Sequence, residues 1–162
     1  MTIFSKVGVT LFSIFNSMGF LFGKVTEQMI ENFNSELIPY QIDSKEFGYL
    51  TVITSMPEAT QQQVGEVIHA DRTTTVKKVD HLESLGYLIR VKNTADRRMY
   101  NLQLTNKSEH MLKQLWPILI SCERSVLSSL TDEEVQNLNN IFIKDIIILF
   151  LHITICPLKI NE

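Results

Sequence analysis

The sequence predicts a mainly α-helical fold with one small β-hairpin, and two observations support this fold class. Apolar side chains recur at intervals of three and four residues through much of the 162-residue chain, as they do along one face of a helix. After Gly86 the period changes to two, which is typical of half-buried strands. Gly86 itself suits the left-handed position that ends a helix.

The middle of the chain carries signals for two short helices in succession. Thr60 and Gln63 have the spacing of a capping box, so a helix is expected to start one residue after Thr60. A polar interruption at residues 69–72 separates this helix from the next, which either Asp71 or Thr73 can cap. Two helices joined by a tight turn predict a helix-turn-helix.

The second of these helices has two contrasting faces when its residues are placed at 100° per position. Hydroxyls, lysines and an imidazole occupy one face, which suits the phosphates and base edges of a DNA major groove. An ordinary solvated helix face is the alternative interpretation. The polar face consists of Thr73, Thr74, Lys77 and His81, with Lys78 at its margin, and the packing face consists of Thr75, Val76, Val79 and Leu82.

The hairpin is expected to place its basic residues outward. Ile89 and Val91 alternate with Arg90 and Lys92 in the first strand, which predicts that the two apolar side chains face the core. Apolar residues also alternate along the returning strand, at Tyr100, Leu102 and Leu104.

The loop between the strands ends in two arginines, Arg97 and Arg98. A narrow minor groove has a strong negative potential that attracts arginine, so this loop is a candidate DNA probe, or wing. Asp80 and Asp96 are candidates to orient a wing arginine. The full set of candidate DNA contacts is Gln61, Thr73, Thr74, Lys77, Lys78, His81, Lys92, Arg97 and Arg98.

Residues 18–140 resemble the multiple-antibiotic-resistance-regulator (MarR) type of winged-helix transcription factor. The resemblance rests on Gly48-Tyr-Leu50, the stretch from Asp71 to Gly86, and the wing Asp96-Arg97-Arg98 followed by Leu102-Gln-Leu-Thr105. It implies a homodimer that binds a palindromic operator, usually as a repressor, and leaves it when a small, often aromatic effector binds. The family more often has apolar residues where Thr75 and Lys78 stand, so base preference does not transfer, and residues 142–162 lie outside the resemblance.

The family's effector crevice, between the dimerisation helices and the DNA-binding part, suggests a pocket in this chain. Its candidate lining consists of aromatic and thioether side chains that are more often plain core residues. These are Phe20, Phe47, Met56 and Trp116.

The organisation expected from these elements is a winged helix-turn-helix at residues 39–105 in a single compact chain, with dimerisation helices at 1–38 and 106–162. The first helix should end at Asn34-Ser35 or be ended by Pro39, and Thr131 and Glu134 form a further capping box. The apolar terminal segments cannot remain solvated singly, which favours a dimer.

Charge and composition support a DNA-binding interpretation. The whole chain carries a net charge of −3, but residues 71–98 contain seven Lys or Arg against four Asp or Glu, a net charge of +3. The remainder is therefore −6. A basic surface on an acidic body directs the basic side toward DNA, because the local field governs the encounter.

Catalytic and metal-binding motifs are not expected. Cys122 and Cys156 lack metal-ligand spacing and are expected to be reduced thiols of a cytoplasmic protein, and the four histidines form no ligand cluster. The apolar stretch 146–158 has thirteen residues, short of the ~20 that a membrane-spanning helix needs, so no stable membrane insertion is expected. No enzyme activity and no cofactor are predicted. A winged-helix module that binds proteins, and a membrane-associated effector-binding protein, are the alternatives.

Overall fold

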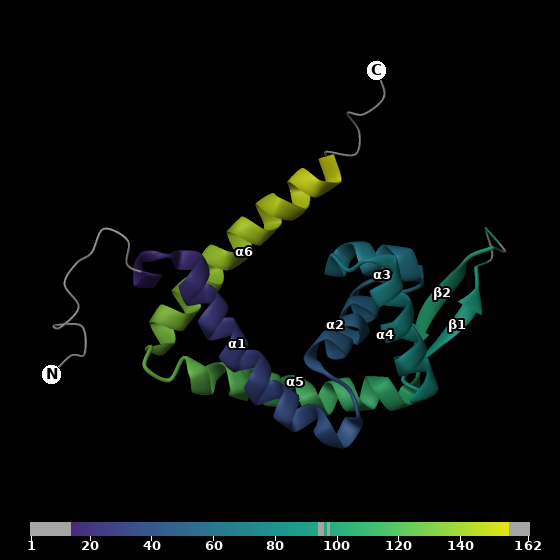
Figure 1. Cartoon of the computed structure of the whole chain (residues 1–162), viewed down its shortest axis with the longest axis horizontal. Helices are drawn as coiled ribbons and strands as arrows, with labels where there is room; N and C mark the ends of the chain where they lie inside the picture. Colours follow the sequence, from purple (N-terminus) through teal and green to yellow (C-terminus); the bar gives the residue numbers. More distant parts are fainter. Residues whose placement is uncertain (1–13, 94–95, 97, 156–162) are drawn as a thin grey trace, which may run out of the picture. The chain divides into compact units, whose positions relative to one another are not determined.

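A computed structural model of the chain describes residues 14–93, 96 and 98–155, with side chains described as far as residue 144. It divides into two compact units, residues 1–123 and 124–162. As predicted, the described part is mainly helical with one antiparallel hairpin (Figure 1). The helices and strands are α1 (Met18–Leu37), α2 (Ser44–Ser55), α3 (Gln61–Ile68), α4 (Arg72–Ser84), β1 (Leu88–Lys92), β2 (Tyr100–Leu104), α5 (Asn106–Val126) and α6 (Asp132–Ile155).

The signals at the helix ends are confirmed. The Thr60 hydroxyl accepts from the Gln63 backbone N–H, and the Gln63 amide oxygen accepts from the Thr60 N–H, which forms the expected capping box of α3. Asp71 caps α4, with Oδ1 2.9 Å from the Thr74 nitrogen. Gly86 has a φ of +71°, the left-handed conformation that the sequence indicated.

The limits of α1 and α6 also agree with sequence signals. α1 continues to Leu37 and is followed by the short 3-10 helix Ile38–Tyr40, which contains Pro39. Proline rather than Asn34-Ser35 therefore marks the end of α1. In the second unit, Thr131 and Glu134 form the capping box of α6. Within the described residues, no helix is both long and apolar enough to cross a membrane.

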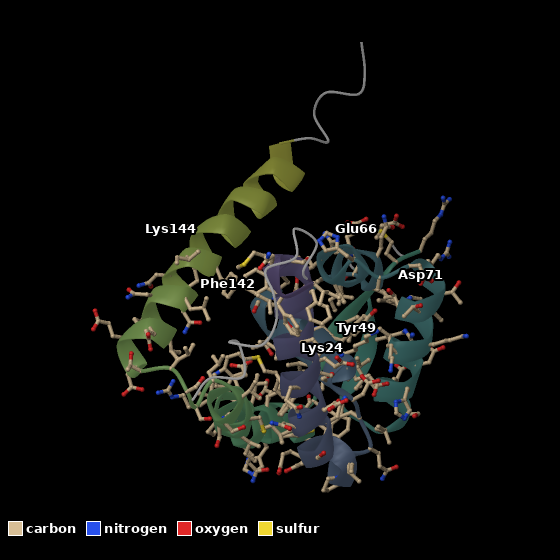
Figure 2. The ribbon with its side chains drawn as sticks, turned by 60° about the vertical axis from the view of Figure 1, so that its left-hand side comes forward. Lys24, Tyr49, Glu66, Asp71, Phe142 and Lys144 are labelled. Carbon is tan, nitrogen blue, oxygen red and sulfur yellow. The ribbon has the colours of Figure 1, made fainter. Side chains whose placement is uncertain are left out.

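The core of the first unit is formed by α2, α3, α4 and the hairpin, together with the end of α1 and the first half of α5 (Figure 1). Tyr49 is fully buried in this region, whereas Asp71 lies at the surface (Figure 2). α3 and α4 cross so closely that Gly65 of α3 is against the side chain of Thr75. The largest fully buried side chains are Phe33, Leu37, Tyr49, Leu50, Val64, Val79, Leu82, Leu88, Leu102 and Leu115.

The prediction for the inward face of β1 was wrong. Ile89 is 46% exposed, whereas the side chain of Arg90 is only 22% exposed. In the observed register Arg90 pairs with Leu102, and Leu88 with Leu104, so arginine shares the inward face with leucines. This face is stable because carboxylates of α4 meet the guanidinium, which alternation of apolar residues alone does not reveal.

Candidate nucleic-acid interface

The two faces of α4 are as predicted from its periodicity. Thr75, Val79 and Leu82 are buried against the core, and Val76 is half-buried. On the opposite side Thr73, Thr74 and Lys77 are exposed, together with the first helical residue, Arg72. The first half of α4 therefore presents hydroxyls and two cations to solvent. Arg72 was not among the contacts predicted from the sequence, although a cation at the first position of a basic-faced helix was a usable signal.

Two other predicted DNA contacts on α4, Lys78 and His81, are instead paired with acidic residues at the start of α2. Lys78 Nζ lies 2.5 Å from Asp43 Oδ2 and 3.4 Å from Glu46 Oε1. His81 Nδ1 lies 2.7 Å from Glu46 Oε1. Both side chains therefore have protein partners in the absence of DNA, and Glu46, which connects them, was not recognised from the sequence.

Arg90 connects the hairpin to both helices of the helix-turn-helix. One of its terminal nitrogens, Nη2, donates to Asp80 Oδ1 at 2.5 Å and to Gln61 Oε1 at 3.0 Å, and the other forms an ion pair with Glu83. Asp80 thus meets an arginine of the β1 strand. Gln61, a predicted DNA contact, has its amide oxygen engaged in the same cluster. The alternation of apolar residues in β1 had predicted that Arg90 faces outward.

The tip of the hairpin is only partly described. Arg97 lies outside the described residues, while Arg98 and Lys92 are exposed. Asp96 Oδ1 accepts from the backbone N–H of Arg98 at 2.9 Å, and the Asp96 N–H donates to Asn93 Oδ1 at 2.9 Å. Asp96 therefore stabilises the turn that carries Arg98 by a hydrogen bond to the Arg98 backbone.

A hollow of about 650 Å³ lies between α3, the start of α4 and the hairpin. Arg72, Arg90 and Arg98 contribute cations to its lining, and Tyr100 and Met99 contribute apolar surface. Glu66 is the carboxylate among its lining residues. The hollow separates the exposed part of α4 from the wing, and cations lie on both of its sides.

The four residues proposed for an effector pocket lie in different surroundings. Phe47 is buried and packs edge-on against Phe33, with ring centroids 4.9 Å apart, and Met56 packs at the edge of the core. Phe20 lines a groove on α1 with Phe22 and Ile30, while Trp116 lines another between α2 and α5. The structure of one chain does not bring the four together in either groove.

The described residues contain no group of three or more His, Cys, Asp or Glu placed to hold a metal ion. Burial raises the pKa of the Cys122 thiol, and the carboxylates of Glu36 and Glu123 raise it further, so the thiolate is disfavoured there. Cys156 lies outside the described residues.

Comparison with known proteins finds a family that is similar to the central part of the chain. The MarR family model matches residues 40–99, the segment that contains α2, α3, α4 and β1. The chain is 26% identical over 112 residues to the HTH-type transcriptional regulator BilQ of Clostridioides difficile, covering 68% of this chain and 76% of BilQ. Residues 40–99 of this chain are therefore similar to the MarR family, and the sequence as a whole is similar to an HTH-type transcriptional regulator.

Two further proteins are similar to this chain, one in sequence and one in fold. The HTH-type transcriptional regulator PecS of Dickeya dadantii is 28% identical over 102 residues, which is 61% of either chain. The transcriptional repressor CouR, solved bound to a 23-mer DNA duplex, has a TM-score of 0.73 at 19% identity and covers 86% of this chain and 99% of its own. At that identity the structural likeness concerns the fold.

Proposed function

We propose that this chain is a MarR-type regulator that binds duplex DNA with the first half of α4 in the major groove and the wing in the adjacent minor groove. The observation that carries the proposal is the exposed, cationic first half of α4 beside a hairpin whose tip carries the exposed Arg98. A recognition helix in a helix-turn-helix contacts bases mainly through its N-terminal residues. Such a protein works where the DNA is, so a cytoplasmic location is part of the proposal.

Selection from a random duplex library tests this proposal most directly. The protein is expected to enrich duplexes that contain a palindromic pair of half-sites. Changing Arg98 to alanine should weaken binding to the enriched duplex by about 1–3 kcal/mol if the side chain enters a groove. Failure to enrich any duplex sequence would refute sequence-specific binding, and unchanged affinity in an Arg97 and Arg98 double alanine variant would refute the role of the wing.

Dimerisation through the first helix is the second part of the proposal. Exposed apolar side chains gather at and before the start of α1, where solvation of so much apolar surface is unfavourable. A second copy of the chain would cover them, with the two α4 helices roughly 34 Å apart, one turn of DNA. Sedimentation at micromolar concentration should show a dimer. The apolar residues concerned are Ile14, Phe15, Met18, Leu21, Phe22 and Val25.

Repression released by a small aromatic ligand is the third part. The groove beside Trp116 has a volume of about 480 Å³ and is lined by Leu112 and Pro117 of α5 and by three hydroxyl residues of α2. Trp116 is 52% exposed and is the single tryptophan of the chain, so its fluorescence reports on this groove. Salicylate is expected to change Trp116 emission and to weaken the DNA complex. DNA release by salicylate without any change in emission would place the ligand elsewhere.

A further inference from the structure

Four side chains that can carry charge join the start of α2 to the middle of α4. Glu46 is at the centre of this cluster and is only 3% exposed, although it is an ionisable residue. Asp43 precedes it at the N-terminus of α2, and Lys78 and His81 reach it from α4, one helical turn apart. These contacts span 35 positions of the sequence, so they fix tertiary rather than local structure.

Both carboxylate oxygens of Glu46 are engaged. Oε2 accepts from the backbone N–H of Asp43 at 3.0 Å and completes the capping box of α2. Oε1 accepts from His81 Nδ1 at 2.7 Å and lies 3.4 Å from Lys78 Nζ. One carboxylate therefore links the first turn of α2 to two positions on α4.

The electrostatics favour the charged forms of Asp43 and Lys78. Burial opposes the charge on Asp43, but the hydrogen bond from Lys78 and the backbone N–H of Glu46 outweigh it, so the pKa of Asp43 is lowered. Burial likewise opposes the charge on Lys78, yet the two carboxylates raise its pKa. Removal of one partner leaves the others with uncompensated charge in a partly desolvated site, which makes the arrangement specific.

We propose that Glu46 is a positioning residue for α4, an inference that rests on the proposed binding of duplex DNA. By holding Lys78 and His81 it fixes the rotation of α4 about its axis, and so the direction in which Thr73 and Lys77 point. Neighbouring residues of a helix point about 100° apart, so Lys77 is directed to solvent while Lys78 is directed to α2. Lys78 and His81 then act on DNA affinity through Glu46 and do not touch DNA, a different role from the one the sequence pattern predicted.

The adjacent lysines provide a matched test. Binding to the duplex most enriched by the wild-type protein is measured over a series of salt concentrations for Lys77→Gln and Lys78→Gln. Loss of a phosphate contact at Lys77 should reduce the slope of log K against log salt by about one. Lys78→Gln should leave that slope unchanged while weakening affinity by roughly tenfold, within the usual range of energetic coupling between sites. Lys78→Arg, which keeps the ion pair, should restore wild-type affinity.

A slope reduction in Lys78→Gln equal to that in Lys77→Gln would overturn the proposal. Glu46→Gln gives a second measurement, because its amide oxygen still accepts from Asp43 and preserves the cap. If Lys78 acts through Glu46, Glu46→Gln with Lys78→Gln should weaken binding no more than the stronger single change. Additive losses would also contradict the proposal.

Amide hydrogen exchange on the full chain without DNA separates this inference from the proposed function. Glu46→Gln and Lys78→Gln should speed exchange along α4, whereas Lys77→Gln should not, because Lys77 is directed to solvent. Equal exchange in all three variants would refute the positioning role even if the wild-type protein binds DNA. Failure of the wild-type protein to bind any duplex would instead refute the proposed function and leave the exchange result as the measure of positioning.

Discussion

Replacing Gly65 by alanine tests how closely α3 and α4 pack. A Cβ at this position would lie 2.7 Å from Thr75 Oγ1 and 3.3 Å from Thr75 Cγ2. Thr75 is buried, and its hydroxyl donates to the Asp71 carbonyl at 3.0 Å and accepts from the Tyr49 hydroxyl at 3.2 Å. The added methyl must therefore separate the two helices or displace a bonded hydroxyl.

The expected loss of stability follows from three contributions. Alanine in place of a glycine inside a helix ordinarily stabilises a protein by about 0.5–1 kcal/mol. Overpacking of a buried site costs about 1–3 kcal/mol. Displacement of the Thr75 hydroxyl costs about 1 kcal/mol more for the hydrogen bond from Tyr49. Together these predict that Gly65→Ala lowers the free energy of unfolding by about 1–3 kcal/mol.

Urea unfolding with a matched glycine gives the decisive comparison. Gly48 also lies inside a helix, α2, but a Cβ there would meet nothing within 4 Å, so Gly48→Ala should stabilise by about 0.5–1 kcal/mol. Introducing Gly65→Ala into a Thr75→Ala background should be neutral or stabilising, because the obstructing side chain is gone. The reasoning is refuted if Gly65→Ala alone stabilises the protein as much as Gly48→Ala does.

Three further predictions concern Arg90 of β1, the N-cap of α2 and the end of α4. Arg90→Ala should lower the free energy of unfolding by about 1–3 kcal/mol, because the guanidinium bonds to both α3 and α4. Asp80→Asn should cost only about 0–1 kcal/mol, because Asp80 is 58% exposed. Equal losses in urea unfolding would contradict this. The pKa of Asp43 is lowered on folding, so its contribution to the free energy of unfolding should be full above about pH 4 and lost as the pH falls through its folded pKa, below 3.8. The stability difference between wild type and Asp43→Asn should therefore shrink in acid. A constant difference would argue against the pair with Lys78. Gly86→Ala should destabilise by about 1–2 kcal/mol through its positive φ alone, since a Cβ there meets no atom within 4 Å, and an unchanged thermal midpoint would contradict that strain.

Features that depend on neighbouring residues could be predicted from the sequence. The capping box of Thr60 and Gln63, the cap at Asp71 and the left-handed Gly86 each involve groups within a few positions, where residue type fixes the hydrogen bond or the backbone angle. The buried face of α4 was predictable for the same reason. Its period follows from helix geometry whatever it packs against.

Features that depend on distant partners could not be predicted in this way. The pattern of β1 placed Ile89 inward because apolar residues usually alternate toward the core, and the carboxylates that allow Arg90 to face inward belong to α4. The same applies to Lys78 and His81, whose partners lie 35 residues away. For the effector pocket, the family resemblance indicated a crevice but could not say which aromatic residues of one chain share it.

The partners of α4 divide this helix along its length. Its buried residues face the core, Lys78 and His81 face α2, and Asp80 and Glu83 face the hairpin through Arg90. From Lys78 onward, most polar side chains of α4 therefore hold another element of the fold. The exposed cations and hydroxyl residues of the first half are Arg72, Thr73, Thr74 and Lys77. In the proposed DNA complex this helix enters the groove by its N-terminal half. Substitutions there should change which bases are preferred, while substitutions in the second half should change the angle of entry and weaken all sequences alike.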